Sequence, residues 1–110
     1  MGKVYKRLGA TVVTANVNTG LYTVPASTSA IVGNLHVCNI GSTERTFRIA
    51  VVNGAIGVVS TKDYLYYDTI IAANTGVAFN IGIILPTTYT ILVRANHADV
   101  IFSAFGAEIN

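Results

Sequence analysis

The sequence predicts an all-β fold, a single-domain β-sandwich of about eight short antiparallel strands with a jelly-roll-like arrangement. Three observations support this prediction. Apolar residues alternate with small or polar ones at a period of two, turn residues recur every 8 to 12 positions, and no segment shows helical periodicity free of glycine and β-branched residues. The 110 residues form one domain, 1–110, with residues 1–7 as an extended N-terminal arm or a frayed, solvated end.

The alternation is clearest in three segments. Phe47, Ile49 and Val51 share one face of a strand. In residues 77–85 every second residue, starting at Val77, is a large apolar one, so these side chains share one face. Residues 89–94 repeat the pattern. We therefore expect the phenylalanines Phe47, Phe79 and Phe102 to point into the core. The expected strands are 4–17, 21–24, 30–40, 46–51, 64–71, 77–85, 89–95 and 100–109.

Turn residues separate these segments, mainly Gly, Asn, Ser, Thr and Pro. The dipeptide Asn53-Gly54 has the strongest hairpin preference, because both residue types tolerate positive φ. Other turns are expected at 18–20, 25–29, 41–43, 60–63, 73–76, 86–88 and 96–99. Strand order does not follow from these signals.

The surface of the predicted sandwich carries unusually little charge. Hydrophobic residues make up 52% of the chain and charged residues 11%, against about 25% charged in a typical soluble domain. Residues 8–43 and 69–93 contain no Lys, Arg, Asp or Glu. We expect another protein to cover part of this surface, and a homo-oligomer, dimer or trimer, is predicted. The alternative is a sandwich kept soluble by Thr and Asn alone.

Charge and hydropathy also exclude several partners. The net charge of +2 is too small and too scattered to indicate nucleic acid. No apolar run approaches the roughly 20 residues that span a bilayer, and no continuous export signal is present. With one cysteine, the chain forms no intramolecular disulfide.

Residues that could perform chemistry do not form a recognisable set. His36 and Cys38 share a strand face, but with His97 they are one ligand short of a structural zinc site. No charge near Cys38 would activate its thiol, so we expect a small core hydrophobe there. Asp63 and Asp68 are five residues apart and so fall on opposite faces of a regular strand. Their convergence as an acid–base pair would need a bulge, which favours capping and turn roles. We predict a protein that is not an enzyme and has no metal or cofactor.

Two groups of residues are predicted to contact other proteins. The first is a run of tyrosines, a residue type enriched at protein interfaces; the alternative is a stacking platform in a carbohydrate-binding module. The second is the basic start of the chain. The candidate contact residues are Tyr64, Tyr66, Tyr67, Lys3, Lys6 and Arg7.

Several segments occur in an order that resembles small virion structural proteins of tailed bacteriophages. They are LYTVPA (21–26), LHVCN (35–39), TFRIAV (46–51), DYLYYD (63–68), IAAN (71–74) and FSAFG (102–106). Each motif is weakly specific, and the resemblance covers roughly residues 20–109. The chain departs from it at Ser27, where glycine is frequent, and at Ile40, where arginine often follows the asparagine.

The resemblance implies a capsid cement, or decoration, protein that binds the major capsid protein shell and stabilises it. A tail or baseplate component is the alternative, with tail proteins as partners. It implies no catalytic residues. The expected location is the virion, at the capsid surface, after synthesis in the host cytoplasm.

Overall fold

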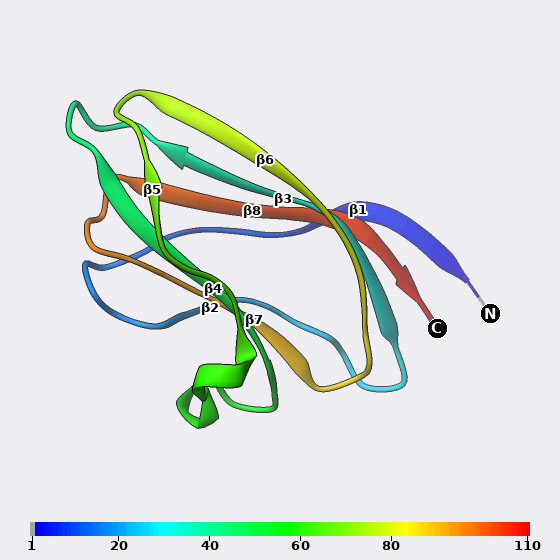
Figure 1. The fold of residues 1–110 in the computed structure, drawn as a ribbon. Coiled ribbons are helices and arrows are strands. Elements are labelled where there is room, and N and C mark those ends of the chain that lie inside the picture. The colour runs from blue at the N-terminus through cyan, green and yellow to red at the C-terminus, as the bar shows by residue number, and fades with distance from the viewer. Residues whose placement is uncertain (1) are drawn as a thin grey trace.

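The computed structural model describes residues 2–110 and contains eight strands in two antiparallel sheets (Figure 1). The strands are β1 (Lys3–Val12), β2 (Thr19–Thr23), β3 (Ser29–Asn39), β4 (Arg45–Asn53), β5 (Tyr64–Ile71), β6 (Thr75–Leu85), β7 (Tyr89–Ala95) and β8 (Val100–Ile109). Within residues 2–110 no helix is long and apolar enough to cross a membrane.

The strand order completes what the sequence could not predict. One sheet has the order β1-β8-β3-β6 and the other β2-β7-β4-β5, so consecutive strands mostly lie in opposite sheets, as in a jelly roll. We call these the first and second sheet. The prediction of an eight-strand, jelly-roll-like sandwich is confirmed.

The beginning of the chain differs from its prediction. β1 ends at Val12, and residues 14–17 form a turn in which Asn16 has φ 60. Residues 1–7 were expected to form an extended arm or a frayed end, whereas Lys3 to Arg7 pair with β8, from Lys3 opposite Ile109 to Arg7 opposite Phe105. Residue 1 lies outside the described part.

β4 and β5 pair antiparallel as a hairpin, but the tight turn expected at Asn53-Gly54 is not formed. Gly54 does have φ 107, but residues 54–63 continue as a loop before β5 begins. This loop contains two short 3-10 helices, η1 (Ile56–Val58) and η2 (Thr61–Asp63). A capping box caps the start of η2: the Asp63 carboxylate accepts a hydrogen bond from the backbone N–H of Ser60, the N-cap residue, at 2.9 Å.

The core lies between the two sheets and is built from the residues that alternate inward. Phe47 and Phe102 are both 1% exposed, and their rings meet edge to face at a centroid distance of 6.2 Å. Phe79 also points inward, 6.0 Å from Phe47, but is only half-buried because it lies on β6, at the edge of the first sheet.

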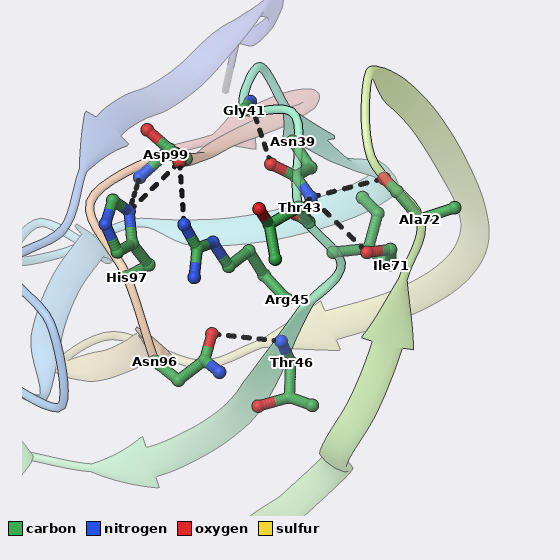
Figure 2. A network of polar contacts seen from close by, with 10 residues as sticks. All are labelled: Asn39, Gly41, Thr43, Arg45, Thr46, Ile71, Ala72, Asn96, His97 and Asp99. Carbon is green, nitrogen blue, oxygen red and sulfur yellow. Dashed lines mark hydrogen bonds and ion pairs between the residues drawn. The ribbon is translucent and has the colours of Figure 1, made fainter.

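One end of the sandwich is held by a buried polar residue that the sequence did not reveal (Figure 2). The Asn39 side chain is fully buried, and its Nδ2 donates to the carbonyls of Thr43, Ile71 and Ala72 at 2.9, 3.4 and 3.2 Å. Its Oδ1 accepts from the Gly41 N–H at 3.0 Å. Asn39 therefore joins the β3–β4 loop to the β5–β6 loop.

A neighbouring network attaches the β7–β8 loop to the same end. Arg45 Nη2 lies 3.2 Å from Asp99 Oδ2, and His97 Nδ1 lies 3.1 Å from the same oxygen (Figure 2). A side chain at Gly41 would collide with the Asp99 carboxylate, so this close approach requires glycine. We interpret both networks as structural, because their polar groups bind one another and the backbone, apart from Arg45 Nε, which is buried without a hydrogen-bond partner.

Candidate interface

The outer face of the first sheet is not covered by any other part of the described chain, and we call it the open face. Alternation along the strands brings cross-strand rows of apolar or small side chains onto it. Tyr5 and Ile84, at the two ends of one row, are 76% and 71% exposed. The rows are Tyr5, Ala107, Ile31, Ile84; Ala10, Ser103, His36, Ala78; and Val12, Ile101, Cys38, Gly76.

A hollow of about 660 Å³ lies on the open face beside β1. Its apolar wall includes Tyr5 and Phe105, and Lys3 and Arg7 stand at its border. Within residues 2–110, neither Lys3 nor Arg7 has a carboxylate partner. The lining residues are Lys3, Tyr5, Lys6, Arg7, Ile31, Gly33, Asn34, Phe105, Gly106 and Ala107. We call this the basic hollow.

Lys6 differs from the two other basic residues of β1, because alternation directs it toward the other side of the strand. Its Nζ lies 3.1 Å from Glu108 Oε1. The Tyr22 hydroxyl donates to Glu108 Oε2 at 2.6 Å, and this bond, with that of Lys6, lowers the pKa of Glu108. Burial and the adjacent carboxylate raise the pKa of Tyr22. Lys6 therefore helps to fix β2 against the first sheet.

Cys38 and His36 also lie on the open face. The prediction that Cys38 is a core residue is wrong: the thiol is half-buried and faces away from the sandwich interior. His36 is exposed and meets the Phe105 ring edge to face at 5.2 Å. Among residues 2–110 no three His, Cys, Asp or Glu side chains are grouped so that they could hold a metal ion.

The centre of the outer face of the second sheet is covered by a loop. Its outward-facing residues Ala50, Val52 and Leu92 are at most 1% exposed, because residues 54–63 fold back over β4. Ile56 lies over Gly20, where an added Cβ would be 3.9 Å from Ile56 Cγ2. Thr90 Oγ1 donates to the Gly54 carbonyl at 2.9 Å. We call residues 54–63 the covering loop.

The three predicted tyrosines do not form one platform. Register shifts in the β4–β5 pairing act as bulges that turn Tyr64 and Tyr67 outward and Tyr66 inward;. The Tyr66 ring packs on Phe79 at 4.4 Å. Tyr64 and Tyr67 meet edge to face at 4.9 Å and line a recess of about 550 Å³ with Val59, Ser60 and Thr61.

Arg48 and Asp68 complete this tyrosine cluster, and sequence reasoning missed their pairing. Arg48 Nε and Nη2 donate to the two Asp68 oxygens at 2.7 and 3.2 Å, which lowers the pKa of Asp68 and raises that of Arg48. The guanidinium lies 4.1 Å from the centroid of the Tyr67 ring. One face of Tyr67 is therefore occupied within the chain, which weakens the carbohydrate-stacking interpretation.

The fold is similar to that of chains in solved structures. The protein is similar to a chain in the structure of infectious bursal disease virus Gx strain, with a TM-score of 0.54 and 15% identity over 97% of this chain and 30% of that chain. Two crystal structures of a pentameric capsid protein isolated from metagenomic phage sequences give TM-scores of 0.42 and 0.43, with 18% and 19% identity. They cover 91% of this chain and 60% and 61% of theirs.

The protein thus spans less than two thirds of the length of each of these chains. No protein-family model and no curated protein sequence matches it. The first of these likenesses and the strand order together show the fold: this chain is a jelly-roll-like β-sandwich of the kind present in that viral chain.

Proposed function

We propose that the protein is a virion structural component, a capsid cement protein that binds the outer surface of a shell of major capsid protein. The open face carries this proposal. The open face exposes Tyr5 and Ile84, and its two central strands, β8 and β3, present no charged side chain on it. Such an apolar face is costly to leave in water. The fold shared with a viral chain and the order of phage-like motifs support the same role.

The mechanism would be burial of apolar surface, with the basic hollow adding selectivity. Lys3 and Arg7 have no internal counter-charge, so a carboxylate on the partner could pair with them at the border of the apolar wall;. Because the protein would bind only the assembled shell, each bound copy would shift the equilibrium toward that state. A modest gain at each site would accumulate over the many sites of a shell.

The proposal includes no catalytic step. Its support is that the polar groups around Asn39, Asp99 and Asp68 in residues 2–110 are mostly paired within the chain. The pocket beside Asp68 has a volume of only about 30 Å³. The tyrosine cluster is the second candidate contact, through the exposed part of Tyr67 and the recess beside it.

Copy number and heat resistance test this function. Purified particles should contain the protein in a fixed ratio to the major capsid protein, and particles stripped of it should release DNA at lower temperature than complete ones. Adding the protein back should restore the release temperature. Few copies per particle, with identical release with and without the protein, would indicate a tail or baseplate component instead.

A further inference from the structure

The four edge strands of the sandwich, β1, β6, β2 and β5, are not equally protected against pairing with another chain. An edge strand presents unpaired backbone N–H and C=O groups, and proteins block such edges with charge, bulges or shortness. β1 has Lys3, Lys6 and Arg7 and a bulge after Arg7. β2 has only five residues, and β5 has two register shifts and Asp68.

β6 lacks most of these features. It is 11 residues long, contains no charged residue or proline, and lies within the uncharged segment 69–93. It has one bulge, where Ile81 and Gly82 lie opposite the single residue Gly33 of β3 and Gly82 has φ 57. Residues 75–80 remain a regular, uncharged edge. Figure 1 shows β6 as the outermost strand of its sheet.

The side chains of β6 give a second, independent observation. Val77, Phe79 and Ile81 face the core but remain only half-buried, whereas Leu35 and Val37 on the adjacent β3 are at most 2% exposed. The sandwich is therefore incompletely closed along β6, where the Tyr66 ring reaches across to Phe79. A further strand beside β6 would cover these side chains.

We propose that β6 pairs antiparallel with β6 of a second copy, forming a two-fold dimer in which two first sheets become one continuous sheet. The chain's own features indicate the second copy as occupant. An uncharged strand meets its copy without like-charge repulsion, and the other edges of the chain are charged, bulged or short. Self-pairing is isologous, so it closes at two copies. Ala78, near the middle of 75–80, would lie close to the two-fold axis.

The test compares Ala78→Lys with Ala10→Lys. Both alanines are exposed, face outward and end the same cross-strand row, Ala10, Ser103, His36, Ala78, at opposite edges of one sheet. In sedimentation equilibrium the wild-type protein should reach twice the 11.6 kDa monomer mass at micromolar concentration. Ala78→Lys should weaken the dimer about tenfold or more, because two lysines would face each other, while Ala10→Lys should dimerise like wild type.

Asn80→Lys, also exposed on β6, provides a second variant if Ala78→Lys unfolds; circular dichroism and the melting temperature monitor the fold. A wild-type monomer over the whole concentration range would overturn the proposal, as would equal weakening by the β1 and β6 substitutions. If the wild-type protein is monomeric and Ala78→Lys nevertheless loses particle binding, the edge belongs to a strand of a different partner and the self-pairing proposal is overturned. The dimer does not depend on the proposed virion role, so either can fail alone.

Discussion

The two outer faces of the sandwich differ in how much of their apolar surface the chain itself covers. The second sheet buries Leu92 beneath the covering loop and pairs Arg48 with Asp68 at its edge. The first sheet leaves Tyr5 and Ile84 exposed and has two unpaired cations beside a hollow. The centre of the second sheet is therefore covered by the chain itself, although Ile70 and Tyr67 on its edge strand β5 stay 64% and 56% exposed. The first sheet has no such cover over its centre. Binding should accordingly be sought on the first sheet and stability determinants on the second.

The largest expected effect compares Leu92→Ala with Ile84→Ala. Leu92 is fully buried while Ile84 is 71% exposed, so the first substitution should cost about 2–5 kcal/mol of unfolding free energy and the second about 0.5 kcal/mol or less. Chemical denaturation at one protein concentration measures both. Similar costs would show that the covering loop does not seal the second sheet.

Attachment to particles should depend on Tyr5 more than on Tyr67. Both rings are exposed, but Tyr5 lies on the open face with Lys3 Nζ 5.5 Å from its ring centroid, whereas Arg48 packs on Tyr67 at 4.1 Å and is held there by Asp68. Tyr5→Ala should weaken rebinding to stripped particles by about 2 kcal/mol, roughly thirtyfold, as for a buried aromatic anchor. Tyr67→Ala is the matched control with little change. The reverse ranking would move the contact to the tyrosine cluster.

Cys38 offers a probe of the same face with a smaller effect. In the isolated protein the half-buried thiol should react with a thiol reagent more slowly than in denaturant. Bound to particles it should react several-fold more slowly again, because a docked partner excludes the reagent. Unchanged kinetics on binding would show that the far end of the open face, near Val12 and Ile101, stays free.

The smallest effect concerns acid and the second sheet. Arg48 lowers the folded-state pKa of Asp68 below its usual 3.8, so the pair's contribution is fully present above that value and is lost as pH falls through the folded-state pKa. Asp68→Asn should be slightly less stable than wild type near neutral pH, and the difference should shrink as the pH falls below 3.8 and through the lower folded-state pKa of Asp68. Urea denaturation across this pH range measures the difference. A difference that persists in acid would assign the effect to packing rather than ionisation.

The regular parts of the fold were predictable because their patterns are local. The bounds of β7 and β8 match the alternation and the turn residues around them, and the inward residues of β6 were assigned to the correct face. The end of β1 and the covering loop were not predictable, because turn propensity at Asn53-Gly54 does not reveal what the following residues pack on.

The candidate site was less accessible to sequence reasoning. Tyr66 points inward because β5 bulges where it pairs with β4. The sequence of β5 alone does not show these bulges, since they depend on the pairing. The role of Asn39 depends on two loops, β3–β4 and β5–β6, that meet only in the folded chain. Their charge was enough to predict Lys3 and Arg7 as contact residues. That Lys6 faces the other side of β1 and pairs with Glu108 became clear only from the pairing of β1 with β8.

The position of β8 has a consequence for how the chain is made. β8 lies between β1 and β3, so the partner of Lys3 is Ile109, near the other end of the sequence. During synthesis β1 emerges first and remains without its neighbour until β8 leaves the ribosome. The first sheet therefore forms only after translation of Val100–Ile109, and pairing so distant in sequence is expected to be slow. Until then, the nascent chain exposes the flanks of β1 and β3 to chaperones and to neighbouring chains.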